Sequence, residues 1–144
     1  MAIWRVRKIF KVPVGHRLSK HKGLCKNIHG HNLKLEVQIS SFVLNDNDMV
    51  IDFKDIKTIV EPMLDQFDHA ILVNNSDTTV KEFSTKAGFK TRVLYDEDVD
   101  PTAEVFAEYL FLKIQNYVNK IDSRLVLDWI RVWENDGSMT EYSE

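Results

Sequence analysis

The sequence predicts an α+β domain of two layers, in which an antiparallel β-sheet carries two helices on one face. Hydrophobic and polar residues alternate over residues 3–16 and 29–43, and this period of two indicates strands with one buried face. Hydrophobic residues recur at helical spacing over residues 52–67 and 100–118, which predicts two amphipathic helices. Strands joined in hairpins, together with such helices, favour a sheet that is covered on one side.

The composition is that of a globular protein, and we expect one domain over residues 1–144. The chain has 44% hydrophobic and 28% charged residues, and no stretch approaches the about 18 apolar residues that span a bilayer. The basic N-terminus lacks the apolar segment of a signal peptide. Cys25 is the only cysteine, so no internal disulfide can form, and we expect a cytoplasmic location.

Charge is distributed unevenly along the chain. Residues 1–40 contain nine Lys and Arg against one Asp or Glu, whereas residues 41–144 contain ten against twenty-one. The basic N-terminal third favours an anionic ligand there, although a solvated strand edge would have the same composition. The net charge of −3 does not call for a nucleic acid partner.

The first two strands place histidines on their hydrophobic faces. His16 ends the hydrophobic row of 3–16, in which Pro13 indicates an edge position or a bulge. Residues 17–28 show no period and are expected to form a loop. His29 and His31 lie on the hydrophobic face of 29–43.

The middle of the chain predicts a hairpin, a helix and a less regular stretch. A turn rich in Asn and Asp follows the second strand, and a short strand at 49–53 completes a predicted hairpin over 31–53. The helix over 52–67 begins at Asp52, a residue type that caps helix N-termini. A short helix over 79–87 closed by a glycine, and a strand over 89–95, are expected next.

The C-terminal third predicts a helix and two strands. Asp100 and Pro101 have the residue types that favour the N-cap and first turn of a helix, which would continue to residue 118. A strong strand follows over 125–134, and residues 140–143 are expected to add an edge strand.

The three strand histidines could hold one metal ion. His29 and His31 are two residues apart on one strand, about 6.6 Å along its axis, so both rings can reach a single ion. His16 can supply a third nitrogen from its own strand, and His21 is an alternative ligand in the loop. Three histidines with an open fourth position are typical of catalytic zinc, although imidazole also binds other transition metals.

Cys25 lies four residues before His29 and allows three interpretations. It could be a buried apolar thiol, a fourth ligand of a closed structural zinc site, or a base beside the metal. Nearby cations, Lys22 and Lys26 among them, would favour the thiolate that a base requires.

Two further positions each allow both a structural and a catalytic or binding interpretation. Asp68-His69 follows a helix, where His69 could interact with the helix dipole or form a proton relay oriented by Asp68. Glu134 ends the last strong strand, where it could lie in solvent or accept paired N–H bonds from a guanidine-like edge such as that of a pterin.

A metal oxygenase of the cupin type is a competing interpretation. His29-Gly30-His31 followed by Glu36 superficially matches the ligand pattern of that class. The unbroken alternation of the strand sends Glu36 to the face opposite the histidines, which argues against it.

Taken together, these segments resemble the 6-pyruvoyl-tetrahydropterin synthase / 6-carboxy-tetrahydropterin synthase family. The resemblance covers nearly the whole chain in family order. The matching segments are Gly15-His16-Arg17-Leu18, Cys25-Lys26-Asn27-Ile28-His29-Gly30-His31-Asn32, Met49-Val50-Ile51-Asp52-Phe53, Leu64-Asp65-Gln66-Phe67-Asp68-His69, Pro101-Thr102-Ala103-Glu104 and Trp133-Glu134.

The resemblance implies the tunnelling fold, whose subunits join into barrels, and a set of site residues. His16, His29 and His31 correspond to ligands of one zinc ion per subunit. Cys25 corresponds to the base, and Asp68 and His69 to its relay partners. Glu134 corresponds to the carboxylate that binds the pterin and takes part in the relay, and Thr102 to a residue that helps hold the ring. Active sites between the subunits of a homo-oligomer, with a hexamer favoured, are also implied.

The implied substrate is 7,8-dihydroneopterin triphosphate, and Arg17, Lys20, Lys22 and Lys26 are expected triphosphate contacts. The three residues between Cys25 and His29 resemble the branch that makes 6-carboxy-5,6,7,8-tetrahydropterin for queuosine and releases acetaldehyde. The alternative is the 6-pyruvoyl branch, which eliminates triphosphate only. A lesser alternative is a non-catalytic protein that binds a purine-like ligand or a structural zinc ion.

Overall fold

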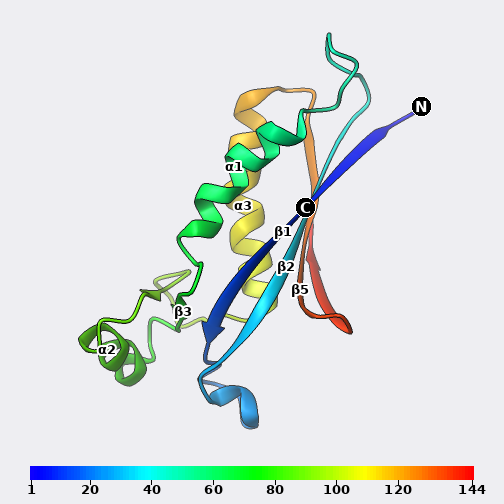
Figure 1. Ribbon diagram of the computed structural model, residues 1–144. Coiled ribbons are helices and arrows are strands. Elements are labelled where there is room, and N and C mark those ends of the chain that lie inside the picture. The colour runs from blue at the N-terminus through cyan, green and yellow to red at the C-terminus, as the bar shows by residue number, and fades with distance from the viewer.

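The computed structural model describes residues 1–144 as one curved sheet with three α-helices (Figure 1). The sheet has six strands in the order β4-β3-β1-β2-β5-β6. The strands are β1 (Trp4–His16), β2 (His29–Ser41), β3 (Ile71–Leu72), β4 (Thr91–Arg92), β5 (Val126–Asn135) and β6 (Ser138–Tyr142). The helices are α1 (Phe53–Asp65), α2 (Thr78–Lys86) and α3 (Ala103–Ile121), with a short 3₁₀ helix, η1 (Leu24–Lys26).

The long strands β1 and β2 form the antiparallel hairpin on which the site is built. Their register runs from Trp4 opposite Ser41 to His16 opposite His29, and residues 17–28 connect them as the expected loop. On the other side of β1, β3 pairs with Gly15 and His16 alone. Pro13 therefore lies where no strand adjoins the other side of β1, which confirms its predicted edge position.

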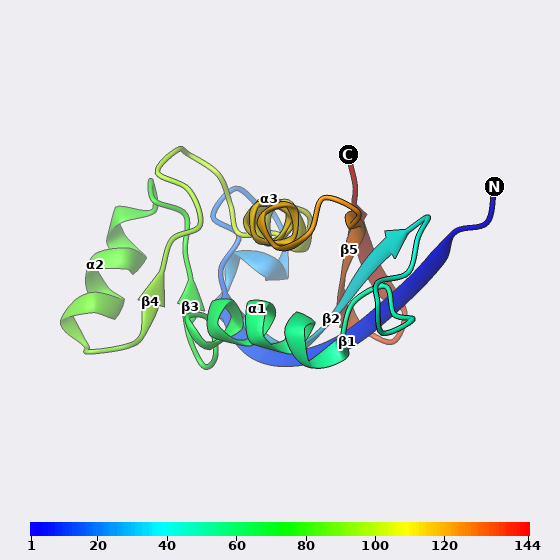
Figure 2. The ribbon, with the colours of Figure 1, turned by 90° about the horizontal axis from the view of Figure 1, so that it is seen from above.

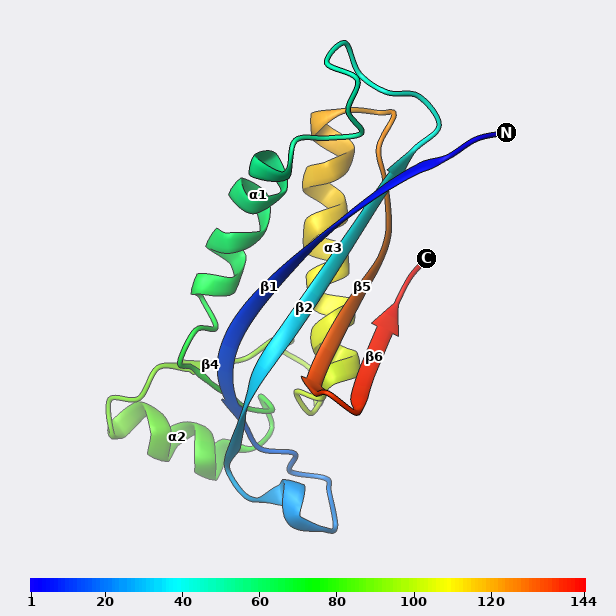
Figure 3. The ribbon, with the colours of Figure 1, turned by 45° about the vertical axis from the view of Figure 1, so that its right-hand side comes forward.

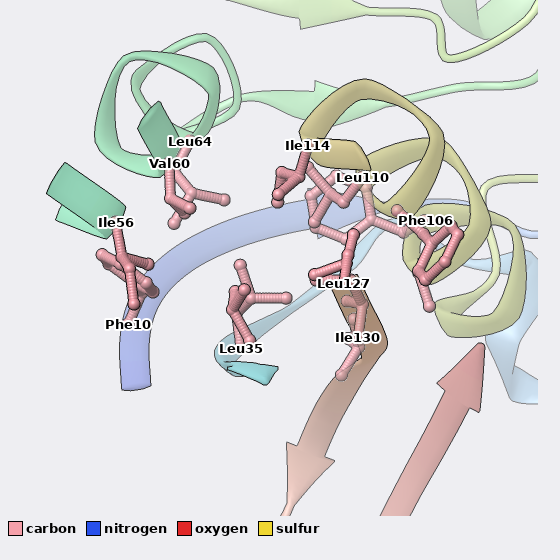
Figure 4. Packing of buried hydrophobic residues seen from close by; sticks show 14 of the residues in the cluster. Phe10, Leu35, Ile56, Val60, Leu64, Phe106, Leu110, Ile114, Leu127 and Ile130 are labelled. Atoms are coloured by element: carbon pink, nitrogen blue, oxygen red, sulfur yellow. The ribbon is translucent and has the colours of Figure 1, made fainter. Parts of the chain in front are cut away.

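Helices α1 and α3 pack on the same face of the sheet, which curves around them (Figure 2). The Asp52 carboxylate accepts a hydrogen bond from the Lys54 backbone N–H at 2.8 Å, as expected of an N-cap. Side chains of β1, β2, β5 and both helices converge in the core, among them Phe10, Leu35, Ile56 and Leu110 (Figure 4). The predicted two-layer α+β class is confirmed.

The predicted hairpin over 31–53 is wrong. β2 already has β1 on one side and β5 on the other, so it offers no free edge to a strand at 49–53. Val50 and Ile51 are buried in the hydrophobic core instead, within a connection that has no strand pairing. Their apolar run reflects burial rather than membership of the sheet.

The predicted start of the last helix at Asp100 and Pro101 is also wrong. Helix α3 begins at Ala103, and its N-cap is Thr102, which accepts a hydrogen bond from the Val105 N–H at 3.2 Å. The Asp100 carboxylate is occupied by other donors, so it does not cap the helix.

The segment between α1 and α3 makes the sheet mixed rather than purely antiparallel. β3 and β4 run parallel to β1, and at two residues each they are too short to show a period in the sequence. The short helix expected over 79–87 is confirmed as α2, and Gly88 follows it with a φ of +76°. The expected strand over 89–95 shrinks to β4.

The loop with η1, the strand β3 and the helix α2 all lie at the end of the sheet where β1 ends and β2 begins (Figures 1 and 3). The expected edge strand near the C-terminus is confirmed as β6, which pairs with β5. None of the helices is both long and apolar enough to cross a membrane.

Candidate metal centre and active site

Three histidines meet at the end of the β1–β2 hairpin. His16 lies opposite His29 across the two strands, and His31 lies opposite Val14, on the same face and one position along it. One ligand atom from each ring lies within 4.8 Å of the other two. The ring centroids are 4.5 to 5.2 Å apart. The predicted convergence of these three residues is confirmed, and His21 is not part of the group.

Backbone carbonyl groups orient two of the imidazoles. His16 Nδ1 lies 2.9 Å from the Pro101 carbonyl oxygen, and His29 Nδ1 lies 2.7 Å from that of Asn27. A carbonyl oxygen can only accept, so each Nδ1 carries the proton in the neutral ring and each Nε2 presents a lone pair. This is the outer-shell arrangement that fixes metal-binding histidines.

The inward-facing nitrogens fit a cation. His16 Nε2 and His29 Nε2 are 3.0 Å apart with lone pairs facing each other, and the buried His31 Nε2 has no hydrogen-bond partner. Burial lowers the pKa of His16, and the neighbouring His29 and His31 lower it further, against an opposing effect of the hydrogen bond to Pro101. The neutral ring that a metal requires is thus the favoured form. The three histidines could therefore hold one metal ion.

Cys25 lies in η1, within the loop that joins the two metal-site strands. Its side chain is partly exposed, and its sulfur is not among the mutually close donor atoms of the histidine group. The Cys25 carbonyl oxygen accepts a hydrogen bond from the Leu18 N–H at 3.0 Å, which closes the loop on itself.

Asp68 and His69 form a hydrogen-bonded pair directly after α1. Their side chains meet at 2.5 Å between Oδ1 and Nδ1, and His69 has a φ of +58°. This unusual backbone conformation is held by the His69 N–H, which donates to the Pro13 carbonyl, and by Lys90 Nζ, which donates to the carbonyls of Asp65 and Asp68. The His69 side chain is 82% exposed and points away from the core.

Glu134 lies near the end of β5 beside the histidines. Its Oε2 is 3.7 Å from His31 Nε2, and it lines a cavity of about 120 Å³ between β5, β6 and the start of α3. Thr102 lines a small gap together with His16 and Glu134. His69 lines a different, open groove of about 390 Å³, which also includes His31. One chain thus brings Glu134 and Thr102 to the histidines, whereas His69 lines a groove that Glu134 and Thr102 do not share.

Two of the four basic residues expected at a triphosphate are already paired. Arg17 forms an ion pair with Asp77 at 2.9 Å and donates through Nε to the Lys26 carbonyl. Lys20 Nζ donates to the Asp98 carbonyl at 2.6 Å. Lys22 and Lys26 are exposed.

The partners of this loop, Asn74, Asp77 and Asp100, were not predicted from the sequence. The only signal was the Asp-Pro pair at residues 100 and 101, which is equally typical of a helix start.

Glu36 points away from the histidines, as the strand alternation predicts. It is buried on the opposite face of the sheet and lies 3.7 Å from each of three cations, Arg7, Lys34 and Arg131. The ligand set of the cupin interpretation is therefore not formed.

Comparison with known families agrees with the geometry. The family model described as 6-pyruvoyl tetrahydropterin synthase matches residues 5–144. The chain belongs to this family. It is accordingly a pterin synthase, an enzyme of the lyase class, and the resemblance predicted from the sequence motifs is confirmed.

Two relatives that match nearly the whole chain carry the same name. The chain is 32% identical to the 6-carboxy-5,6,7,8-tetrahydropterin synthase of Haemophilus influenzae, over 99% of this chain and 100% of that protein. It is 26% identical to the synthase of the same name from Aquifex aeolicus, over 98% of both chains.

Solved structures share the fold. An uncharacterized protein of Wolinella succinogenes matches with a TM-score of 0.81 at 17% identity, over 99% of both chains. The 6-pyruvoyl tetrahydropterin synthase of Caenorhabditis elegans matches with a TM-score of 0.70 at 23% identity, over 100% of this chain and 97% of that one.

Proposed function

We propose that this protein converts 7,8-dihydroneopterin triphosphate and water to 6-carboxy-5,6,7,8-tetrahydropterin, acetaldehyde and triphosphate. The observation that carries the proposal is the histidine cluster of β1 and β2, with Cys25 in the loop that joins the same strands. The relative from Haemophilus influenzae, similar over its full length, is named for this product. The reaction would serve queuosine synthesis in the cytoplasm.

The metal of the site is zinc in this proposal, one ion per chain, held by His16, His29 and His31. The two facing lone pairs and the unpartnered His31 nitrogen support a divalent cation here. When bound, zinc supplies a Lewis acid that acidifies the hydroxyl groups of the substrate side chain.

The remaining steps belong to side chains of this protein. Cys25, in the same loop as the exposed Lys22 and Lys26, removes a proton from the substrate side chain as the thiolate. His69, oriented by Asp68, exchanges a second proton with the substrate. Glu134 accepts two parallel N–H bonds from the pterin edge, and Thr102 helps to hold the ring.

The active site is completed by a second copy of the chain in this proposal. Glu134 and His69 line different concavities of one subunit, and the Asp68–His69 pair projects outward. A homo-oligomer, expected to be a hexamer, would place this pair beside the Cys25 of a neighbour. The only other partner required is the small-molecule substrate.

Formation of 6-pyruvoyl-tetrahydropterin is the second candidate function. It is favoured by the similarity in fold to the Caenorhabditis elegans protein named for that activity. Both candidates use the same residues, and they differ in whether a carbon–carbon bond of the side chain is broken.

A product assay distinguishes these candidates. Zinc-loaded protein incubated with dihydroneopterin triphosphate is expected to release acetaldehyde and triphosphate in equal amounts, with a carboxy-pterin identified by mass spectrometry. Cys25→Ala is the inactive control: it should retain zinc and release no acetaldehyde, because the base is lost and the ligands are kept.

Other outcomes of this assay would replace the proposal. Triphosphate without acetaldehyde would assign the 6-pyruvoyl activity. Absence of turnover by the zinc-loaded protein would reject both, and loss of zinc from Cys25→Ala would indicate a structural site in which the sulfur is a ligand.

A further inference from the structure

We infer that Asp100 is a positioning residue that fixes the Cys25 loop relative to the histidine cluster. The inference rests on the proposed function, because it assigns the loop the task of presenting a base. Asp100 does not belong to the histidine group, and its carboxylate accepts hydrogen bonds from Ser19, Lys20 and Asn74 instead.

The Asp100 carboxylate binds the start of the loop through hydrogen bonds to Ser19 and Lys20. The residue is only 8% exposed. Its Oδ1 accepts hydrogen bonds from Ser19 Oγ at 2.6 Å and from Asn74 Nδ2 at 3.0 Å, and its Oδ2 accepts one from the Lys20 backbone N–H at 2.8 Å. Two consecutive loop residues and one residue of the segment after β3 are thus joined at one buried carboxylate.

A backbone hydrogen bond connects this anchored part of the loop to Cys25. Leu18, the residue before Ser19, donates its N–H to the Cys25 carbonyl. Arg17 links the same part of the loop to Asp77 and to the Lys26 carbonyl, one residue beyond Cys25. The carbonyls of Cys25 and Lys26 are therefore hydrogen-bonded to Leu18 and Arg17, the two residues that precede Ser19, which Asp100 holds.

The chain immediately after Asp100 serves the metal centre. The Pro101 carbonyl bonds to His16 Nδ1, and Thr102 donates its N–H to the Asp100 carbonyl while its side chain caps α3. Three consecutive residues thus contact three parts of the site. Asp100 binds the loop, Pro101 binds His16, and Thr102 caps α3. A displacement of Asp100 would change the distance between the base and the metal, on which the rate of a positioned reaction depends steeply.

The charge and symmetry of a carboxylate are needed at this position. All the donors that meet it require an acceptor, and a carboxylate accepts through both oxygens. The isosteric amide of asparagine would direct an NH₂ group at one of those donors and leave buried hydrogen-bonding groups unpaired.

Asp100→Asn tests the inference, with Asp96→Asn as the matched control on the same segment. Asp96 is exposed and uses only its backbone carbonyl in a hydrogen bond, to Asn75 Nδ2. We expect Asp100→Asn to keep the wild-type zinc content, to lose about 10-fold or more in kcat with a smaller change in KM, and to leave the substrate contacts intact. Asp96→Asn should match the wild type in every measurement.

Alkylation provides a readout that a general loss of stability would not produce. Because the chain has a single cysteine, intact-mass measurement after iodoacetamide treatment reports only on Cys25. In Asp100→Asn the alkylation rate of the folded, zinc-loaded protein should rise about threefold or more, since the loop that carries the thiol is released. This arm needs no substrate, so it remains decisive even if the proposed reaction is not observed.

Two results would overturn the inference. One is a folded Asp100→Asn protein with wild-type kcat and wild-type alkylation. The other is loss of zinc in proportion to loss of kcat, which would place the defect at the histidines. If Asp100→Asn does not fold, Ser19→Ala, which removes one donor to Oδ1, decides: a smaller shift in the same direction supports the inference, and wild-type behaviour overturns it.

Discussion

The buried carboxyl of Asp100 also makes stability depend on pH. Burial by itself would raise its pKa, but the hydrogen bonds from Ser19, Lys20 and Asn74 outweigh burial and hold the pKa below its ordinary value of 3.8. The unfolded chain therefore takes up this proton at a higher pH than the native state does. The stabilisation is fully present above the ordinary value and is lost as the pH falls through the lower native pKa.

Urea unfolding of the wild type and Asp100→Asn, compared from pH 3 to pH 7, checks this expectation. The difference in unfolding free energy should be constant above about pH 5 and should shrink as the pH falls below about 4. The histidine titrations are common to both proteins and cancel in the difference. A difference that stays constant down to pH 3 would contradict the assignment of the low pKa to this carboxyl.

At the residue scale, site residues placed by a local sequence pattern could be predicted, whereas those placed by contacts distant along the chain could not. His16, His29 and His31 could be placed on one face because strand alternation is a local property of each segment. Asp100 could not be predicted, because Ser19 lies 81 residues away along the chain and the same Asp-Pro pair favours a helix N-terminus.

Among the elements, α3 has the clearest contrast between a buried and an exposed face, and its buried face should contribute most of its stabilisation. Leu110 is 0% exposed within the core, whereas Leu112, two residues along the same helix, is 39% exposed. Replacing Leu110 by alanine should lower the free energy of unfolding by about 2–5 kcal/mol, because it removes buried methyl groups and leaves a cavity.

Leu112→Ala is the matched control and should cost under about 1 kcal/mol, since helix propensity changes little and less buried surface is lost. Chemical denaturation monitored by circular dichroism measures both variants. Equal losses in the two would show that α3 does not bury the face that the structure assigns to it.

Elements with a long, clear period were predicted most accurately. β1, β2, α1 and α3 have long hydrophobic patterns, so their existence and approximate bounds followed from the sequence. The strand expected at 49–53 failed because a short apolar run does not distinguish a buried connection from a strand. β3 was missed because two residues cannot show an alternation, and the strand expected over 89–95 was predicted too long because only Thr91 and Arg92 pair as β4.

At the scale of the whole molecule, strand order was the part that local patterns could not give. β5 pairs with β2 although all three helices lie between these strands in the sequence. β3 joins the sheet beside β1 and runs parallel to it. This topology brings residues 74–77 and 98–100 against the loop that carries Cys25. The long segment between α1 and α3 therefore supports that loop through hydrogen bonds.

The central claim is that three imidazole nitrogens hold one zinc ion while the Cys25 sulfur stays free to act as a base. Zinc K-edge X-ray absorption of the loaded wild-type protein tests it most directly. We predict nitrogen and oxygen ligands at about 2.0–2.1 Å, including three imidazoles, and no sulfur. A sulfur ligand at about 2.3 Å would contradict the account, because a metal-bound thiolate could not serve as the base.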